Sequence, residues 1–296
     1  MTIDANSDDL ILGVAGAGAM GRGIVQVAAA GGCKVLLYDT NADAAKEAVD
    51  FVGNMLNRNV EKGRMAEEDA QAAIANIEVV GSLVGFAHCE IVIEAVVENL
   101  DIKNVVFREI EAAVSDETII ASNTSSLSVT TIAAACVRPE RVAGMHFFNP
   151  VPLMKLVEVI DGVRTAPHVA GVLMDLGKRM TRTPVHVRDA PGFLVNQVGR
   201  GYNIECAHIA SDGVAGYADI DRICRDAVGF RMGPFELMDL TAVDVTHPAT
   251  NLIYEQFYHE PRFRPATLMQ MQLDAGLLGR KVGQGFYRYE DGKAQV

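Results

Sequence analysis

The feature that most constrains the fold is a glycine-rich turn between an apolar run and an amphipathic segment. Gly16, Gly18 and Gly21 follow the apolar run LILGVA in the spacing G-x-G-x-x-G, and the residues from Met20 onward have helical periodicity. A second apolar run, KVLLYD, ends in Asp39, eighteen residues after Gly21. This order of strand, glycine turn, helix and acid-terminated strand is typical of a dinucleotide-binding domain. The alternative is a glycine turn in an α/β protein that binds another ligand or none.

Each position of the turn has its own physical reason. Gly16 allows the tight turn, Gly18 lets the backbone approach a pyrophosphate, and Gly21 permits close packing of the helix. The positive N-terminus of the helix from Met20 onward faces the phosphate, and Ala19 and Met20 lie at that end. We therefore expect these five residues to contact the cofactor.

The acid at the end of the second strand predicts which dinucleotide binds. A carboxylate at Asp39 accepts hydrogen bonds from ribose hydroxyls and repels a 2′-phosphate. The following residues, Thr40 and Asn41, offer no arginine to hold such a phosphate. The sequence therefore predicts NAD rather than NADP.

The hydrophobic pattern predicts an α/β protein with two domains. Strand-like runs alternate with helical ones up to about residue 188, and several runs are apolar at every position, which suits a sheet covered on both faces. After the turn signal DAPGF only helical patterns follow. We expect a Rossmann-like, doubly wound, mainly parallel sheet domain over residues 1–188, then a smaller all-helical domain over residues 189–296. The strands are expected in LILGVA, KVLLYD and residues 77–80, 91–96, 118–122, 142–147, 155–160 and 184–188.

Charge and composition exclude several classes of partner. The chain has 38 acidic and 26 basic residues and a net charge of −12, so no general field attracts nucleic acid or an anionic membrane. No apolar run approaches the length of a membrane span, and the polar N-terminus is unlike a secretory signal. Five cysteines without a C-x-x-C pair fit thiols in a reducing compartment and indicate no zinc site. We expect a cytoplasmic protein without nucleic-acid, membrane or metal partners.

One histidine of the seven stands out as a candidate acid/base. His146 ends an apolar strand, and Glu158 follows twelve residues later inside the apolar run KLVEVI. Histidine suits proton transfer near neutral pH because its ordinary pKa is about 6.5. A carboxylate within an apolar strand needs a partner, and His146 is a candidate. By residue type alone, a hydrogen-bonded core histidine and an ion-paired core glutamate explain the pattern equally well.

The residues between Val14 and Tyr289 resemble the L-3-hydroxyacyl-CoA dehydrogenases, including the bacterial 3-hydroxybutyryl-CoA dehydrogenases. The resemblance is carried by VAGAGAMGRGI, EAVVENLDIK, ASNTSSLS, HFFNPVPLMKLVEVI, DAPGFLVNQ, MGPFELMDL and GRKVGQGFY. The segment YEQFYHEPRFRP further resembles the branch that acts on 3-hydroxyadipyl-CoA in phenylacetate breakdown. The resemblance implies a place in fatty acid metabolism such as beta-oxidation, and a homodimer formed through the helical domain.

The resemblance also implies roles for particular residues. It makes His146 the general acid/base, Glu158 its support, and Ser125 and Asn196 the residues that contact the reacting oxygen. Ser125 is also implied in binding cofactor and substrate. The further residues implied around the cofactor are Glu98, Lys103, Asn149 and Lys281. Because Asn196 follows the domain boundary, the site is expected between the domains, which is a common place for one.

Coenzyme A requires cations that an acidic protein does not offer generally. Arg58 and Lys62 are spaced i,i+4 on an expected helix and are followed by Arg64. From spacing alone, a solvated helix end explains these cations as well as a phosphate site does. The resemblance places a CoA-contacting lysine near Lys62 and favours the phosphate site.

The chain departs from the family pattern near its motif asparagine. Relatives usually carry an Arg and a Pro where this chain has Gln197 and Gly201, so the family's pattern around Asn196 does not extend to these two positions. Arg262 and Arg264 are candidates for binding the far carboxylate of a dicarboxylic acyl chain. A solvated loop or a subunit contact is the preferred explanation for both, because clusters of charge are usually solvated.

Three other functions are compatible with parts of the sequence. Ser125, His146 and Glu158 have the residue types of a hydrolytic triad, but no G-x-S-x-G elbow is present and the dinucleotide motif stays unexplained. A protein that keeps the fold without the chemistry conflicts with an intact His146 and Glu158. A dehydrogenase of a free sugar or hydroxy acid would share the cofactor, the His and the Glu. A comparison of activity on substrates with and without the CoA moiety distinguishes this last alternative from a dehydrogenase of acyl-CoA thioesters.

Overall fold

The computed structural model describes residues 3–295, and the chain forms two compact units that meet in the sequence at Phe193 and Leu194. The first unit contains an eight-stranded sheet. Its strands are β1 (Ile11–Ala15), β2 (Lys34–Tyr38), β3 (Ile77–Val79), β4 (Ile91–Glu94), β5 (Ile119–Ser122), β6 (Val142–Phe147), β7 (Leu156–Asp161) and β8 (Thr183–Arg188). Six of them lie within the runs that the sequence predicts as strands, and β7 and β8 each extend one residue beyond the predicted run.

The strand order is β3-β2-β1-β4-β5-β6-β7-β8. The neighbours are parallel except for β6 and β7, which run antiparallel to one another, while β7 and β8 are again parallel. The order reverses between β1 and β4, because the chain returns from β3 to the centre of the sheet to form β4. The doubly wound, mainly parallel sheet that the sequence predicts is confirmed.

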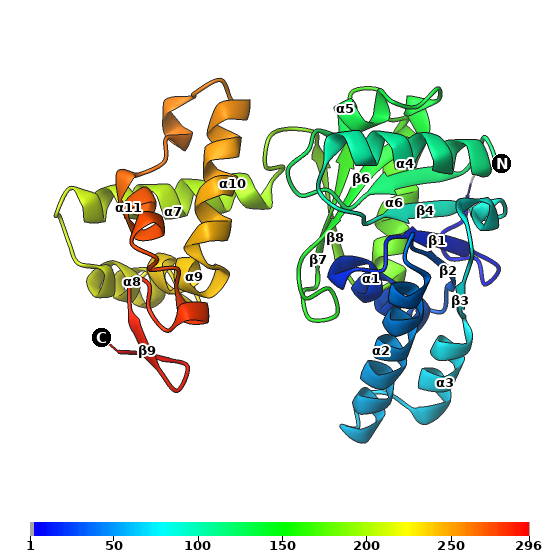
Figure 1. Ribbon diagram of the computed structural model, residues 1–296, viewed down its shortest axis with the longest axis horizontal. Helices are drawn as coiled ribbons and strands as arrows, with labels where there is room; N and C mark the ends of the chain where they lie inside the picture. Colours follow the sequence, from blue (N-terminus) through cyan, green and yellow to red (C-terminus); the bar gives the residue numbers. More distant parts are fainter. Residues whose placement is uncertain (1–2, 296) are drawn as a thin grey trace. The chain divides into compact units, whose positions relative to one another are not determined.

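Helices cover both faces of this sheet (Figure 1). They are α1 (Ala19–Ala30), α2 (Ala42–Glu61), α3 (Glu67–Ala75), α4 (Leu100–Ala113), α5 (Val129–Ala133), α6 (Pro167–Arg179) and the 3-10 turns η1 (Leu83–Phe86) and η2 (Pro139–Arg141). The helices α1, α2, α3 and α6 pack on one face, and α4 and α5 pack on the other. Strands buried on both sides explain the runs that are apolar at every position.

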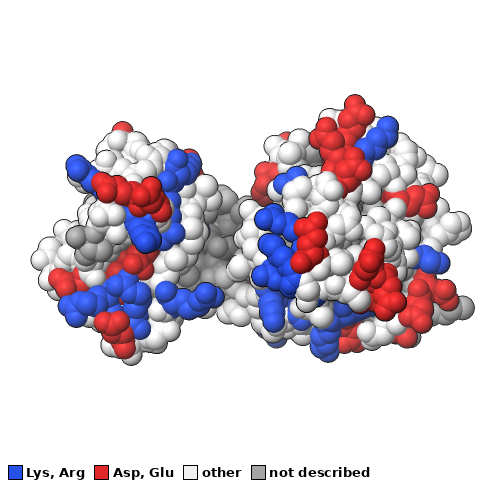
Figure 2. Space-filling model, turned by 90° about the horizontal axis from the view of Figure 1, so that it is seen from below, with Lys and Arg blue, Asp and Glu red and all other residues white. Residues whose placement is uncertain are grey.

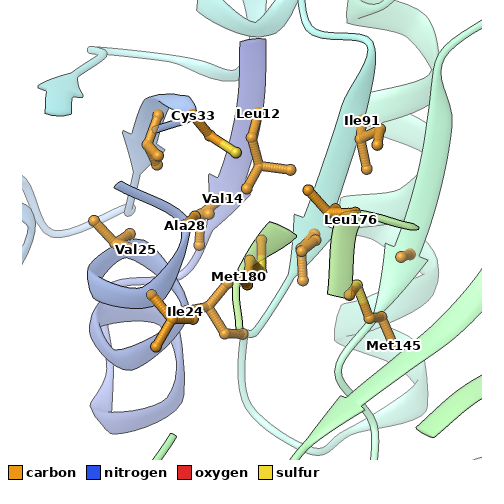
Figure 3. Packing of buried hydrophobic residues seen from close by; sticks show 14 of the residues in the cluster. Leu12, Val14, Ile24, Val25, Ala28, Cys33, Ile91, Met145, Leu176 and Met180 are labelled. Carbon is orange, nitrogen blue, oxygen red and sulfur yellow. The ribbon is translucent and has the colours of Figure 1, made fainter. Parts of the chain in front are cut away.

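The larger core cluster joins α1 and α6 to the middle of the sheet. Leu12 and Val14 of β1 pack with Ile24 of α1 and Leu176 of α6 (Figure 3), and all four are fully buried. Burying one such side chain stabilises the fold by about 1.5 to 3 kcal/mol. The core therefore holds α1 in place directly behind the glycine turn that precedes it.

The second unit is mainly helical. Its elements are α7 (Val195–Ser211), α8 (Tyr217–Asp226), α9 (Pro234–Thr241), α10 (Val243–Gln256), α11 (Thr267–Asp274), the 3-10 turns η3 (Pro261–Phe263) and η4 (Arg280–Val282), and the strands β9 (Arg288–Glu290) and β10 (Lys293–Gln295). Within residues 3–295, no helix combines the length and the apolar character needed to cross a membrane.

The helical character of this unit is confirmed, but its C-terminal end adds a hairpin that the hydrophobic pattern does not predict. Strands β9 and β10 pair antiparallel across Asp291 and Gly292. Both turn residues have positive φ, 50° and 74°, as a two-residue hairpin turn of this kind requires. The dipeptide Asp-Gly is the sequence signal for such a turn, but each flanking strand has only one apolar residue, Tyr289 or Ala294, which is too few to show an alternation.

Candidate active site

The glycine turn lies at the point where the strand order reverses, directly after β1. Gly16 has a φ of +109°, and a Cβ there would lie 2.5 Å from the carbonyl oxygen of Ala95, so a side chain is excluded. A Cβ at Gly21 would collide with the carbonyl oxygen of Gly16. A Cβ at Gly18, in contrast, would meet no atom of the described residues within 4 Å. The turn is therefore closed toward the protein at Gly16 and Gly21 and open in front of Gly18.

The end of β2 holds this turn in place. The carboxylate of Asp39 accepts hydrogen bonds from the backbone N–H of Ala17 at 2.7 Å and of Asn41 at 2.8 Å. Gly18 is the N-cap of α1, and within the described residues neither a side-chain cap nor an acid in the first turn covers that end. The open space at Gly18, the positive end of α1 and the half-buried Asp39 fit a dinucleotide with its pyrophosphate at the helix and a ribose at the acid.

His146 and Glu158 form a buried pair on two neighbouring strands of the same sheet, β6 and β7. They stand opposite one another in the antiparallel ladder of β6 and β7. Nδ1 of His146 lies 2.8 Å from Oε2 of Glu158, and the two side chains are 6% and 0% exposed. When Glu158 accepts in this contact, Nδ1 of the imidazole is the donor, and in the neutral tautomer the lone pair is then on Nε2. The strand pairing thus produces an imidazole whose Nε2 can accept a proton.

Two aromatic rings surround the imidazole. The ring centroids of Phe148 and Phe193 lie 4.4 and 5.9 Å from that of His146. These contacts restrict the rotation of the imidazole and lower the local dielectric constant, so the interaction of an imidazolium with Glu158 is stronger than in water.

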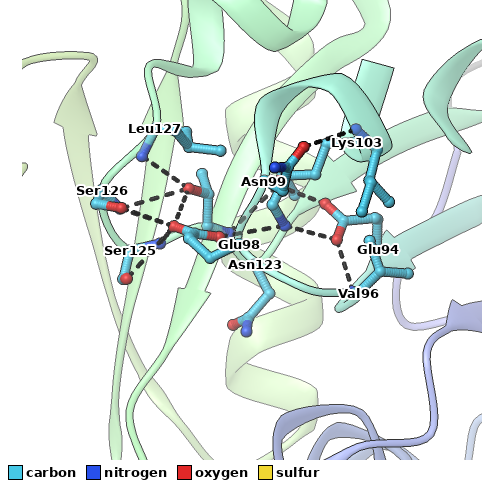
Figure 4. Close-up of polar contacts among 12 residues, drawn as sticks. Glu94, Val96, Glu98, Asn99, Lys103, Asn123, Ser125, Ser126 and Leu127 are labelled. Carbon is cyan, nitrogen blue, oxygen red and sulfur yellow. Dashed lines mark hydrogen bonds and ion pairs between the residues drawn. The ribbon is translucent and has the colours of Figure 1, made fainter. Parts of the chain in front are cut away.

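The loop after β5 is organised around Glu98, which follows β4 (Figure 4). One carboxylate oxygen of Glu98 accepts from the hydroxyl of Thr124 at 2.6 Å and from the amides of Ser125 and Ser126 at 2.9 and 3.1 Å. The hydroxyls of both serines also lie within 3.4 Å of the same oxygen. Glu98 therefore determines where Ser125 stands.

Several groups hold Glu98 in its ionised form. Burial by itself raises the pKa of Glu98, but the Thr124 hydroxyl, the charge of Lys103 and the Ser125 amide together lower it below its ordinary value. Nζ of Lys103 lies 3.3 Å from Glu98 and 2.7 Å from Glu94. The lysine is 1% exposed and Glu94 is fully buried, so the charge of Lys103 is compensated inside the protein.

Glu94 joins this cluster to the sheet itself. Ser122 stands opposite Glu94 in the ladder of β4 and β5 and donates its hydroxyl to Glu94 at 2.7 Å, and the amide of Val96 donates at the same distance. Further along, Oδ1 of Asn123 accepts from the amide of Phe147 at 2.9 Å and ties the end of β5 to the end of β6. Because β1, β2, β4, β5 and β6 are parallel, the glycine turn, Asp39, Glu98, Ser125 and His146 all lie at the carboxyl edge of the sheet.

A pocket of about 570 Å³ opens beside α1, between α2 and the loop that follows β6. One helical stripe lines it, made of Phe51, Met55, Arg58 and Asn59 of α2 and of Lys62 at the C-cap of that helix. Arg22 of α1 and Arg64 add two more cations, and the loop contributes residues 149–153. Seen from the side on which α2 lies, Lys and Arg side chains gather on this unit (Figure 2). Among the described residues that line the pocket, none is a carboxylate.

The structure brings many of the sequence-predicted residues to one place and separates others. The first unit holds the glycine turn, Asp39, Glu98, Ser125, the His146–Glu158 pair and the pocket with Arg58, Lys62 and Asn149. Lys103 faces two carboxylates rather than open space. Two other residues, Asn196 and Lys281, belong to the helical unit. Asn196 lies in the first turn of α7, and Lys281 pairs with Asp244. The roles of these residues toward cofactor and substrate stay predictions.

Three residues around the site were missed by the sequence analysis. Glu94 carries the same signal as Glu158, an acid within an apolar strand, and that signal alone predicts a buried partner. Arg22 is hidden within the glycine motif. Arg182 donates to the carbonyl oxygens of Val151 and Met154 at 2.9 and 3.0 Å and thereby fixes the loop at the pocket. No sequence signal predicts this role of Arg182.

Comparisons with known proteins agree with this geometry. The model of the 3-hydroxyacyl-CoA dehydrogenase NAD-binding domain matches residues 11–190, and that of the C-terminal domain of the same enzyme matches residues 192–289. A 3-hydroxyadipyl-CoA dehydrogenase of Escherichia coli is 40% identical over 93% of this chain, which spans 58% of that relative. A probable 3-hydroxybutyryl-CoA dehydrogenase of Bacillus subtilis is 40% identical over 94% of this chain and 96% of its own length.

Solved structures agree as well. The crystal structure of (S)-3-hydroxybutyryl-CoA dehydrogenase from Ralstonia eutropha matches with a TM-score of 0.90 and 37% identity over 95% of this chain and 99% of that one. Both family models together extend over nearly the whole chain, and the glycine turn with Asp39 is what an NAD-binding domain requires. The chain therefore belongs to the NAD-dependent 3-hydroxyacyl-CoA dehydrogenase family.

Proposed function

We propose that the protein reversibly oxidises 3-hydroxyacyl-CoA thioesters to 3-oxoacyl-CoA thioesters with His146 as the general acid/base. The observation that carries this proposal is the buried pair of His146 and Glu158 in one strand ladder. Nε2 of His146 accepts the proton of the substrate hydroxyl, and the charge that forms on the imidazole is stabilised by Glu158. In the reverse direction the imidazolium returns this proton to the oxygen.

The cofactor is held by the glycine turn and by the acid at the end of β2. Gly18 leaves room for the pyrophosphate, Gly16 and Gly21 allow the close backbone contacts of the turn, and Asp39 accepts from ribose hydroxyls. When bound, NAD is the two-electron oxidant, which accepts the hydride of the substrate carbon. We assign further cofactor contacts to Ala19, Met20, Glu98, Ser125, Asn149 and Lys281. Lys103 acts through Glu98, because its ammonium group is enclosed by two carboxylates.

The reacting oxygen is held by polar side chains in this proposal. Ser125 is presented at the carboxyl edge of the sheet by Glu98, and Asn196 lies in the first turn of α7. Hydroxyl and amide donors that are fixed before the reaction stabilise the charge that develops on an oxygen, which is often a large catalytic term. The phosphates of the CoA moiety bind Arg58 and Lys62 at the pocket beside α2.

A substrate panel tests this function. We expect NADH formation with 3-hydroxybutyryl-CoA and NAD, and none with free 3-hydroxybutyrate or sugar acids. Reaction of the free acids at comparable kcat/KM would favour the hydroxy-acid alternative. Release of CoA without NAD would favour the hydrolase alternative. The residue types of Ser125, His146 and Glu158 are compatible with a hydrolase, but a hydrolase leaves the glycine turn unexplained.

A second candidate substrate carries a carboxylate at the far end of its acyl chain, as 3-hydroxyadipyl-CoA does. In the helical unit, the guanidinium of Arg262 lies 4.6 Å from the ring centroid of Phe263, and both line a pocket of about 300 Å³ with Gln197 and Gly201 of α7. A cation in a pocket favours an anionic group there. Comparing kcat/KM for 3-hydroxybutyryl-CoA and 3-hydroxyadipyl-CoA in the native and Arg262→Met proteins separates the two substrates. A change confined to 3-hydroxyadipyl-CoA supports the carboxylate site.

The cytoplasmic location and the homodimer belong to the same proposal. Exposed apolar side chains of the helical unit, among them Phe230, Leu240 and Val245, support an interface on that unit. Sedimentation analysis tests the dimer, and a purely monomeric protein at micromolar concentration would contradict it. Cell fractionation tests the location.

A further inference from the structure

Arg22 stands between the dinucleotide turn and the pocket beside α2. It follows Gly21 directly, and its guanidinium carbon lies 4.0 Å from the ring centroid of Phe51 on α2. Arg22 and Phe51 both line the pocket of about 570 Å³. Within the described residues the guanidinium has this aromatic partner and no carboxylate partner. A guanidinium stacked on a ring keeps its N–H groups free at its edge, where they can donate.

The other cations of the pocket lie further along α2. Arg58 and Lys62 follow Phe51 by seven and eleven residues, which corresponds to about 10 and 16 Å along a helix. With Arg64 they form a cationic end of the pocket, whereas Arg22 sits alone near its other end. A ligand that fills this pocket therefore carries several negative charges at one end and a polar, less charged segment at the other.

The wall opposite Phe51 is fixed in place. Gly23 packs so closely on Val151 that an added Cβ would lie 2.8 Å from the Cβ of Val151. The guanidinium of Arg182 holds the carbonyl oxygens of the same loop. The loop connects the strand of His146 to the strand of Glu158, so this wall of the pocket is continuous along the chain with the acid/base pair.

An acyl-CoA has the matching distribution of groups. Its phosphates suit the cations at the end of α2, and its pantetheine arm carries two amide carbonyls between those phosphates and the thioester. Arg has five donors and no acceptor, so it is complementary to carbonyl oxygens. Building on the function proposed above, we propose that Arg22, positioned by Phe51, binds the amide carbonyls of the pantetheine arm and is a specificity-determining residue for CoA thioesters.

Two thioesters of the same acyl group test this assignment. Acetoacetyl-pantetheine shares the arm with acetoacetyl-CoA but lacks its phosphates and its adenosine, and both thioesters are assayed by NADH oxidation. We expect R22M to raise KM for both thioesters by a similar factor, about tenfold or more, because a hydrogen bond from a charged donor is lost. K62M should raise KM for acetoacetyl-CoA alone. In both variants kcat should change little, since these contacts are equal in ground and transition states.

Further variants test the stack. R22K keeps the charge but loses the planar group, so it should retain most of the defect. The effects of R22M and F51L should be smaller together than the product of the single effects, because Phe51 acts by positioning Arg22. The matched control is R164M, an exposed arginine of the same unit outside the pocket, which should leave both KM values unchanged.

Four results would overturn the assignment. A defect of R22M confined to acetoacetyl-CoA would mean that Arg22 binds phosphate, and a raised KM for NADH alone would mean that it serves the cofactor. Native-like kinetics of R22K, or fully multiplicative effects of R22M and F51L, would remove the role of the stack. If the native protein reduces neither thioester, the proposed function itself fails, which is a different outcome. Affinity for NADH and the thermal midpoint establish that each variant is folded.

Discussion

Glu158 stands directly opposite His146 in the ladder of β6 and β7, and its carboxylate reaches Nδ1 of the imidazole at 2.8 Å. Two strands that run in opposite directions thus deliver an acid and a base to one point, although twelve residues separate them in the chain. The pairing makes the two side chains one unit, and this has measurable consequences.

Replacement of His146 by Gln should lower kcat by about 10² to 10⁴, the usual contribution of a general acid/base. Glu158→Gln should lower kcat less, because the imidazole is kept but its positive form is no longer stabilised. The double variant should lose far less than the product of the single losses. Steady-state kinetics at saturating NAD measure these values, and NAD affinity serves as the control. Fully multiplicative losses would mean that Glu158 acts elsewhere.

Asp39→Ala should narrow the preference for NAD over NADP, chiefly through weaker use of NAD. The substitution removes both the acceptor for ribose hydroxyls and the repulsion of a 2′-phosphate. It also frees the amides of Ala17 and Asn41, so the glycine turn loses part of its support. The ratio of kcat/KM for the two cofactors measures the effect. If kcat/KM of the native enzyme for NADP equals or exceeds that for NAD, the assignment of Asp39 is contradicted.

Two glycines of the same turn should respond differently to alanine. At Gly21 a Cβ collides with the backbone of Gly16, and no rotamer relieves a clash with backbone, so Gly21→Ala should destabilise the protein by about 2 to 3 kcal/mol or more. At Gly18 a Cβ meets open space, so Gly18→Ala should keep the native stability and raise KM for NAD. Denaturant unfolding and NAD titration check both variants. Equal loss of stability in the two would contradict the geometry of the turn.

Lys62→Met should raise KM for CoA substrates and flatten its dependence on salt concentration. Lys62 lies at the exposed end of α2, where its contribution to phosphate binding is screened by ions. Lys46→Met, an exposed lysine of the same helix outside the pocket, is the control and should change neither quantity. An unchanged KM in the Lys62 variant would leave this lysine as a solvated helix end.

Glu98→Gln should destabilise the protein at neutral pH and much less in acid. The hydrogen bonds from Thr124 and Ser125 and the charge of Lys103 outweigh burial and lower the pKa of Glu98 below its ordinary value of 4.5. The ionised group therefore contributes stability above that ordinary pKa, and the contribution is lost as pH falls through the lowered value. The free energies of unfolding of the native and Glu98→Gln proteins, measured from neutral pH to below the ordinary pKa of Glu98, test the prediction. A difference that is independent of pH would mean that the charge of Glu98 is not involved.

The order of elements in the first unit could be predicted from the sequence because each strand and helix carries its own hydrophobic period. The glycine turn and Asp39 could also be predicted, since the backbone requires those residue types at that spacing. The hairpin of β9 and β10 could not be predicted from hydrophobic periodicity, because each of these strands contains one apolar residue and so leaves no period to detect.

The tertiary structure alone decided which polar residues meet. Periodicity contains no strand direction, so the antiparallel turn from β6 to β7 that places Glu158 opposite His146 follows only from the assembled sheet. The same holds for Lys103, whose helical position says nothing of the two carboxylates that enclose it. Arg22 reaches Phe51 only because α1 and α2 pack side by side. Local sequence specifies local conformation, whereas contacts between distant residues depend on how all the apolar faces are buried at once.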